Sequence, residues 1–337
     1  MRDHRWISRG HRIKRREFIT LLGGMAGWPL AVRAQQPAMP TIGFLGSGSA
    51  EPYAVRLRAF RQGLDEAGFV EGRNVAIEYR FAADQSDRLP GLAAELVRRQ
   101  TSVIAAGGIP AALAIKAATA TVPTVFYVAG DPIKLRLVPR MNHPGGNVTG
   151  VTTMGAELSA KRLELARELV PTASAVALLV NPSNPNTEGI IKDAQAAARS
   201  LGLQLHVLRA MGERDFDASF ATVRQLRAGA LVIGNDSLLV GRSEQLAALG
   251  LRHAVPTIFQ NLEFAAAGGL ASYGSNNSDS YRQAGVYAGR ILKGEKPGNL
   301  PVVQSTKVEL IVNLKTAKSL GITVSLPLLG RADQVIE

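Results

Sequence analysis

The stretch Leu92-Ala-Ala-Glu-Leu-Val-Arg-Arg-Gln-Thr-Ser-Val-Ile-Ala-Ala-Gly107 indicates the fold, because its amphipathic helix pattern leads into a short apolar strand that ends on glycine. The stretch Phe220-Ala-Thr-Val-Arg-Gln-Leu-Arg-Ala-Gly-Ala-Leu-Val-Ile-Gly234 repeats this plan in the second half of the chain. Continuous apolar strands next to helices are typical of a parallel sheet covered on both faces. The repeat therefore predicts two α/β lobes of similar plan.

The same alternation extends outward from this stretch in both directions. Strands are predicted at Thr41–Leu45, Val75–Phe81, Ser102–Ala106, Thr124–Val128, Val148–Val151, Ala175–Val180, Gln204–Leu208, Ala230–Ile233 and Thr257–Gln260. Helices are predicted at Tyr53–Ala67, Leu89–Arg99, Pro110–Thr119, Leu158–Leu169, Glu188–Ser200, Asp217–Arg227 and Ser243–His253. Sheets of this kind bind ligands at the carboxyl ends of their strands, so two facing lobes predict a cleft.

The N-terminal segment has the pattern of an export signal. A basic stretch ends in Arg15-Arg16, an apolar run follows from Phe18 to Val32, and Ala34 completes a small-residue cleavage site. The adjacent arginines are typical of the twin-arginine type of signal. The apolar run is shorter than the roughly 20 residues that span a bilayer. We therefore expect cleavage after Ala34 and a periplasmic mature protein.

Charge and composition exclude several classes of function. The net charge of +12 halves to +6 without residues 1–34, which hold eight Lys and Arg against Asp3 and Glu17. The remaining 303 residues contain no basic run, which argues against nucleic-acid binding. The chain has no cysteine, so disulfides, thiolate catalysis, Cys-ligated metals and a lipid-modified Cys are excluded. The histidines of the mature chain are widely spaced, so no metal site is expected.

The first strand leads into the loop Gly46-Ser47-Gly48-Ser49-Ala50-Glu51. A dinucleotide-binding fingerprint would need a third glycine where Glu51 stands, and a carboxylate there would repel a pyrophosphate. The loop is better interpreted as a small-ligand loop in which Ser47, Ser49 and free amides at a helix start receive a carboxylate. An ordinary strand–helix turn remains the alternative.

Other polar residues follow predicted strands. They are Gly107, Gly108, Pro110 and Asp131 in the first half, and Asn181, Asn184, Asn186, Asn235 and Asp236 in the second. Tyr53, Tyr127 and Tyr273 are candidates for an aromatic wall. Each has a structural alternative: the glycines and asparagines build turns, Asp131 caps a helix, and the tyrosines pack in a core.

No group of residues has the pattern of a catalytic site. The chain contains no G-x-S-x-G elbow, no phosphate-binding loop of the G-x-x-x-x-G-K type and no paired-carboxylate motif. Its histidines do not fall at predicted sheet edges. Binding without chemistry is therefore favoured over an enzyme.

Several motifs resemble one known family. They are Arg15-Arg-Glu-Phe-Ile-Thr-Leu-Leu-Gly-Gly24, Trp28-Pro-Leu-Ala31, Pro144-Gly-Gly-Asn-Val-Thr-Gly-Val-Thr152, Lys161-Arg-Leu-Glu-Leu165, Asn181-Pro-Ser-Asn-Pro185 and Ala265-Ala-Ala-Gly-Gly269. The chain resembles, over essentially its whole length, the ABC transporter substrate-binding proteins that include tryptophan- and tyrosine-type members. The block from Pro144 to Thr152 is the most specific of these motifs.

The resemblance implies a type I periplasmic-binding fold, in which two doubly wound parallel-sheet lobes are joined by three crossing strands. The crossings are expected near Gly150, Gly274 and Ser305. The N-terminal lobe would be 38–149 plus 275–305. The C-terminal lobe would be 150–274 plus 306–337, with the strand Val308–Asn313 returning to it.

The resemblance also implies a set of ligand-binding residues. These are Ser47, Ser49, Tyr53, Gly107, Gly108, Pro110, Asp131, Thr152, Thr153, Asn181, Asn184, Asn186, Asn235, Asp236 and Tyr273. The aromatic-amino-acid members are expected to carry an acidic residue near the first crossing, where this chain has Thr152-Thr153-Met154. Asp131 or Asp236 would then have to hold a ligand ammonium.

The function that the resemblance implies is capture of a small solute by hinge closure, followed by delivery to an ABC permease with its cytoplasmic ATPase. The solute would be an amino acid or an aromatic or carboxylic metabolite. We expect the protein to need no cofactor and to be a monomer. Two alternatives stay open: an exported nucleotide-dependent oxidoreductase and a periplasmic ligand-sensing module. A transcription regulator of the same fold would need DNA-reading helices where the export signal stands.

Overall fold

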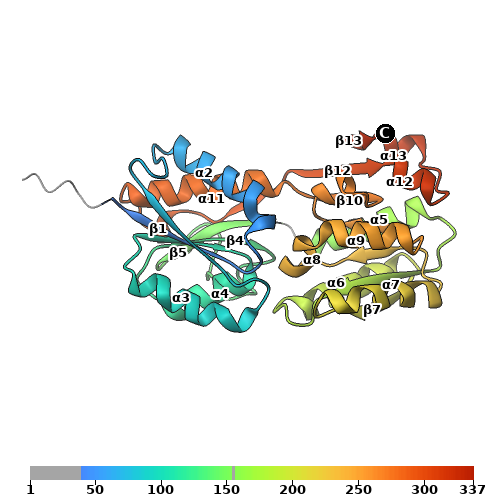
Figure 1. Cartoon of the computed structure of the whole chain (residues 1–337), viewed down its shortest axis with the longest axis horizontal. Coiled ribbons are helices and arrows are strands. Elements are labelled where there is room, and N and C mark those ends of the chain that lie inside the picture. Colours follow the sequence, from blue (N-terminus) through green and yellow to red (C-terminus); the bar gives the residue numbers. More distant parts are fainter. Residues whose placement is uncertain (1–38, 154–155) are drawn as a thin grey trace, which may run out of the picture. The chain divides into compact units, whose positions relative to one another are not determined.

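The computed structural model describes residues 39–153 and 156–337, so the predicted export signal lies outside the described residues. The described chain forms two β-sheets with helices on both faces (Figure 1). This confirms the predicted class of two doubly wound α/β lobes.

The first sheet has six parallel strands in the order β11-β5-β4-β3-β1-β2. The strands are β1 (Thr41–Gly46), β2 (Ala76–Phe81), β3 (Val103–Gly107), β4 (Thr124–Ala129), β5 (Val148–Thr153) and β11 (Val303–Ser305). Its helices are α2 (Ala54–Glu66), α3 (Leu89–Arg98), α4 (Ile109–Ala118) and α11 (Asn277–Leu292), with the short 3-10 helices η1 (Glu51–Tyr53), η2 (Ser86–Arg88) and η4 (Pro297–Asn299).

The second sheet has seven strands in the order β13-β12-β10-β9-β8-β6-β7. The strands are β6 (Ala175–Val180), β7 (Gln204–Arg209), β8 (Leu231–Ile233), β9 (Thr257–Phe259), β10 (Ala271–Ser275), β12 (Val308–Asn313) and β13 (Gln334–Ile336). The helical segments are α5 (Ala156–Leu169), α6 (Thr187–Ser200), η3 (Glu213–Asp215), α7 (Phe216–Gln225), α8 (Ser237–Gly241), α9 (Ser243–Arg252), α10 (Glu263–Ala266), α12 (Leu314–Ser319) and α13 (Leu326–Leu329).

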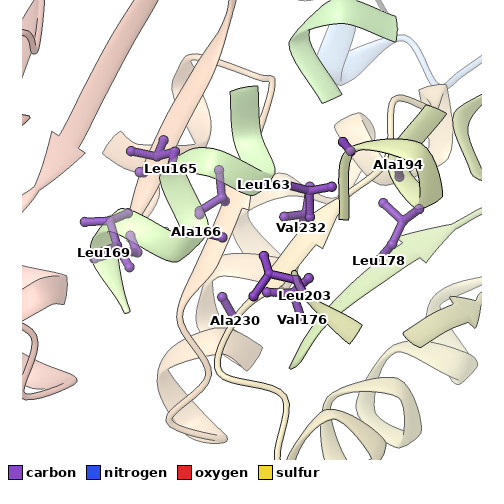
Figure 2. Packing of buried hydrophobic residues seen from close by; sticks show 14 of the residues in the cluster. Leu163, Leu165, Ala166, Leu169, Val176, Leu178, Ala194, Leu203, Ala230 and Val232 are labelled. Atoms are coloured by element: carbon purple, nitrogen blue, oxygen red, sulfur yellow. The ribbon is translucent and has the colours of Figure 1, made fainter. Parts of the chain in front are cut away.

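Strand side chains alternate between the two faces of each sheet, and each face has its own apolar core. In β6, Val176, Leu178 and Val180 belong to the core under α5 and α6, which Figure 2 shows from close by. Ala177 and Leu179 instead join the core under α7 and α9. In the first sheet, α2 and α11 cover one face and α3 and α4 the other (Figure 1). The continuous apolar strands of the sequence follow from this two-sided burial.

Helices α2 and α11 cross closely because both carry glycine at the contact. A Cβ atom at Gly63 would lie 1.8 Å from the carbonyl oxygen of Arg282, and one at Gly285 would lie 2.0 Å from that of Phe60. The chain enters α11 directly after β10 of the second sheet. The contact between α2 and α11 holds this helix against β3, β4 and β5 of the first sheet.

The chain passes three times between the sheets, after β5, after β10 and after β11. One detail differs from the sequence prediction. We expected the first crossing near Gly150, but β5 stays paired with β4 and β11 through Thr153. The structure also contains one antiparallel pair, β10 with β12, because the chain re-enters the second sheet directly from the first. The first crossing is therefore placed after Thr153, at the end of β5. The other lobe boundaries stay predictions.

Candidate functional site

A small cavity of about 40 Å³ lies where the strand ends of the two sheets face each other. The first lobe contributes residues from η1, α2, α4, β4 and α11, and the second contributes residues that follow β6, β8 and β9. The lining consists of Tyr53, Arg56, Gly108, Ile109, Pro110, Tyr127, Ala129, Asn184, Asn235, Asp236, Ser237, Val240, Gln260, Asn277 and Tyr281. Its volume is enough for a few water molecules.

A second pocket of about 670 Å³ adjoins this inner cavity, and Arg56 and Val240 line both. The outer pocket is formed by the start of α2 in the first lobe and by α8, α9 and α10 in the second. Its size falls within the range of small-molecule sites. The two spaces together form one cleft with Arg56 between them.

Arg56 is the one charged side chain lining the inner cavity that forms no hydrogen bond or ion pair with another residue of the described chain. Its guanidinium carbon lies 5.2 Å from the centre of the Tyr53 ring, a cation–π distance. Within the described chain, no carboxylate lies within ion-pair distance of this guanidinium. An arginine remains charged at all physiological pH values and offers a planar fork of donors to a carboxylate. Arg56 is therefore available to a ligand anion.

Three tyrosines form an aromatic wall beside Arg56. The rings of Tyr127 and Tyr281 are 4.5 Å apart, and Tyr53 meets Tyr281 edge to face. The Tyr53 hydroxyl donates to the carbonyl oxygen of Gly107 over 2.9 Å, and the Tyr127 hydroxyl donates to Asn277 Oδ1. Burial raises the pKa of Tyr127 to about 12, so this hydroxyl stays protonated. The wall offers rings for stacking rather than free anions.

Asp236 lines the cavity, but its carboxylate is already occupied. Asn181 and Asn184 donate their side-chain amides to it over 3.0 and 2.9 Å, and the backbone N–H groups of Leu238 and Leu239 cap it from the start of α8. Burial raises the pKa of Asp236, and these donors act in the opposite direction. The Asn-rich loop therefore holds Asp236 as the buried N-cap of α8.

Side-chain amides link the two lobes across the cavity. Asn235 Nδ2 donates to the carbonyl oxygen of Ala129 over 3.2 Å. Gln260 Nε2 donates to Asn235 Oδ1, and the guanidinium of Arg162 donates to Gln260 Oε1 over 3.4 Å. The second lobe is thus connected to the carboxyl end of β4 by a chain of amides.

The structure brings together part of the predicted site. Tyr53, Gly108, Pro110, Asn184, Asn235 and Asp236 line the inner cavity, and Ser49 lines the outer pocket. Six predicted residues line neither space: Ser47, Gly107, Thr152, Thr153, Asn181 and Asn186. Two of them hold lining residues in place, since the Gly107 carbonyl oxygen accepts the Tyr53 hydroxyl and the Asn181 amide donates to Asp236. Ser47 Oγ accepts the backbone N–H of Ala111 in the first turn of α4, so it holds that helix instead of a ligand.

Two of the predicted residues lie elsewhere. Asp131 is exposed, and its carboxylate accepts the backbone N–H groups of Ile133 and Lys134, which makes it a turn residue. Tyr273 lines a separate pocket beside α5, together with Leu165 and Leu310. Strand β10 turns the Tyr273 side chain toward that helix. Asp131 therefore lines neither space of the cleft, and both carboxylate oxygens of Asp236 already accept hydrogen bonds, so an ammonium-binding role stays a prediction for both residues.

The sequence indicated Tyr127 as a candidate for the aromatic wall, but it did not indicate four other residues of the lining, which are Arg56, Gln260, Asn277 and Tyr281. Gln260 directly follows β9, so the rule of strand ends that selected Asn235 applies to it equally. Arg56 stands three residues after Tyr53, one helical turn along the same face. Asn277 and Tyr281 lie on α11, whose position against the first sheet depends on a chain crossing.

Over the described part of the chain, no group of His, Asp or Glu side chains is arranged to hold a metal ion. Likewise, no helix among residues 39–153 and 156–337 is both long and apolar enough to cross a membrane.

The fold and this cleft define a two-lobed solute-binding protein, and comparison with known families makes the assignment specific. The family model of the ABC transporter substrate binding proteins matches residues 53–336. The chain belongs to this family. Its function is therefore that of the solute-binding component of an ABC transport system, which implies a small-molecule ligand and a permease partner.

The chain is also similar to individual members. A tyrosine-binding protein of Clostridioides difficile (strain R20291) is 24% identical over 264 residues, which cover 78% of this chain and 75% of that protein. The crystal structure of an ABC domain from Streptococcus pneumoniae in complex with L-Trp has a TM-score of 0.81 at 24% identity. A conserved domain protein from Vibrio cholerae has a TM-score of 0.82 at 23% identity. Each structural match covers 88% of this chain and 99% of the other.

Proposed function

We propose that this chain is the extracytoplasmic receptor of an ABC import system and that its solute carries a carboxylate, which Arg56 binds in the cleft. In this proposal residues 1–34 direct export and are removed after Ala34. The remaining chain acts in the periplasm as a monomer, binds without chemistry and delivers its solute to the permease and its ATPase.

The observation that carries the proposal is the unengaged guanidinium of Arg56 at the junction of the two spaces. A charge without a partner in a partly desolvated cleft is costly, and a carboxylate would satisfy it with charge-assisted hydrogen bonds. Tyr53, Tyr127 and Tyr281 beside it suit a planar or aromatic body. The tyrosine-binding relative and the L-Trp complex support this solute class, since both amino acids carry a carboxylate.

Solute binding proceeds by hinge closure. The solute enters through the outer pocket, where its carboxylate meets Arg56 from the first lobe. Polar groups that follow β8 and β9 then close on it from the second lobe and exclude water. Binding energy that is realised only when both lobes engage the solute shifts the population toward the closed form.

A thermal-shift screen of the chain from Gln35 onward, freed of carried-over ligand by unfolding and refolding, tests the proposal. The panel pairs acids with their neutral amides: L-tyrosine with L-tyrosinamide, L-tryptophan with its amide, and benzoate and phenylacetate with theirs. At a hundredfold excess over Kd, a ligand adds about 2.7 kcal/mol of stability. We expect stabilisation by an acid and none by its amide. Equal stabilisation by both, or stabilisation by nucleotides alone, would contradict the proposal.

A further inference from the structure

Arg162 is a buried cation that the cleft described above does not explain. It lies on α5 with 2% of its surface exposed, and burial lowers the pKa of its guanidinium to about 10, so that it stays charged at physiological pH. Its Nε donates to the carbonyl oxygen of Tyr273 over 2.9 Å, and Nη2 donates to Gln260 Oε1. Among the described residues no carboxylate pairs with it. A buried charge without a counter-ion lowers the free energy of unfolding, so stability alone does not explain Arg162 at this position.

The guanidinium has only donors, and this fixes the direction of every amide beyond it. Gln260 must turn Oε1 toward Arg162, so its NH₂ group faces the cavity and donates to Asn235 Oδ1. Asn235 must then turn its own NH₂ group outward, where it donates to the carbonyl oxygen of Ala129 in the opposite lobe. If the Gln260 amide were reversed, its oxygen would face Asn235 Oδ1. If the Asn235 amide were reversed, its oxygen would face the carbonyl oxygen of Ala129.

We infer that Arg162 is a positioning residue that sets the polarity of the Arg162–Gln260–Asn235 relay and so favours closure of the lobes. A side-chain amide has two N–H donors. Each relay amide uses one of them, and the other remains for the cavity that both residues line. The relay therefore presents donors to the solute from the second lobe, and the class of group it selects there is an acceptor such as a carboxylate or carbonyl oxygen.

This inference depends on hinge motion but not on the identity of the solute, so its test needs no ligand. The chain has no cysteine, so a disulfide reporter can be introduced cleanly. Pro52 of the first lobe and Gly241 of the second are suitable, because a Cβ at position 241 would lie 3.6 Å from Pro52 Cγ, the atom bonded to Pro52 Cβ. The two Cβ atoms are therefore close to the separation of about 3.5–4.5 Å that a disulfide requires. In the Pro52→Cys/Gly241→Cys protein, the rate of disulfide formation under a fixed oxidant reports the closed population.

The informative variant in that background is Gln260→Glu. The introduced carboxylate still accepts from Arg162, but it cannot donate to Asn235, so the polarity of the relay reverses beyond it. We expect disulfide formation to slow about tenfold, while a melting temperature at or above the parental one shows that the fold is intact, because the new carboxylate pairs with Arg162. Gln225→Glu adds the same charge at an exposed position of the second lobe that lines neither space of the cleft, and it should retain the parental rate.

Arg162→Met should slow disulfide formation as Gln260→Glu does, and Arg162→Lys, which keeps a donor, should restore part of the rate. Gln260→Glu keeps the test decisive where Arg162→Met fails to fold. Parental rates in Gln260→Glu, or equal slowing by Gln225→Glu, would overturn the inference. A failure of the solute screen would leave these rates unaffected, so the two proposals fail separately.

Discussion

Asn235 of the second lobe donates its side-chain N–H to the carbonyl oxygen of Ala129 at the end of β4 in the first lobe, over 3.2 Å. The bond joins residues 106 positions apart in sequence. It connects a loop after β8 to the strand end that lines the same cavity. It is therefore a direct link between closing the lobes and completing the site.

Replacing Asn235 with aspartate should favour the open form, because a carboxylate would face the Ala129 carbonyl oxygen with no proton to donate. The loss of about 1–3 kcal/mol would shift the open-to-closed ratio roughly 5- to 150-fold. Distances between spin labels at exposed Gln62 and Glu188, one on each lobe, would report this shift. Exposed Asn299→Asp is the matched control, and an identical distance distribution in Asn235→Asp would contradict the role assigned to this bond.

Asp84 should make the stability of the protein depend on pH. Both of its carboxylate oxygens are buried without a hydrogen-bond partner among the described residues. Burial raises the pKa of Asp84. The positive charge of Arg242 acts to lower this pKa, and the negative charges of Asp236 and Glu213 act to raise it. The folded state therefore holds the proton more tightly than the unfolded state. Asp84 favours folding below its unfolded pKa, and this contribution is lost as the pH rises through the folded pKa.

Asp84→Asn should therefore stabilise the protein increasingly from pH 4 to pH 7, by about 1 kcal/mol at neutral pH. Asparagine also suits the backbone, because Asp84 has a φ of 63°, in the left-handed region that asparagine tolerates. Urea unfolding at three pH values measures the effect, with exposed Asp87→Asn as the control. A gain that is constant over this range, or a loss at pH 7, would show that Asp84 is paired in solution.

The glycine contact between α2 and α11 should be intolerant of even one methyl group. At Gly285 a Cβ would meet the backbone of α2, so Gly285→Ala should lower the free energy of unfolding by about 1–3 kcal/mol. Gly91, on the exposed side of α3, has no atom within 4 Å of such a Cβ, and Gly91→Ala should instead add about 0.5–1 kcal/mol. Chemical denaturation of both variants checks this, and a neutral Gly285→Ala would mean that the helices are less closely packed.

The sequence predicted most of the fold because both faces of each sheet are covered. Strand β6 matches its prediction at both ends, from Ala175 to Val180. The rule of strand ends likewise selected Asn184, Asn235 and Asp236, which line the cavity. This rule does not predict which face of the sheet a side chain lies on. Tyr273 is the example: it lies on β10, a strand that the periodicity did not predict, and it lines a pocket beside α5 instead of the cleft.

Arg56 shows a different limit of sequence reasoning. It lies on an ordinary-looking helix between exposed Val55 and buried Leu57, and nothing nearby in sequence marks it as different from Arg58 or Arg61. Arg61 pairs with Glu71, whereas Arg56 reaches the cleft beside tyrosines from α11 and β4. Its lack of a partner depends on contacts between distant segments, so only the structure reveals it.

The most direct test of the proposed function is titration calorimetry of the acid that gives the largest thermal shift, against the native chain and its Arg56→Met and Arg58→Met variants. Charge-assisted bonds to the carboxylate are each worth about 1.5–3 kcal/mol. Arg56→Met should therefore raise Kd at least tenfold, while Arg58→Met, which removes an exposed charge from the same helix, should leave Kd unchanged. Equal affinities in all three proteins would contradict the assignment of Arg56 as the carboxylate-binding residue.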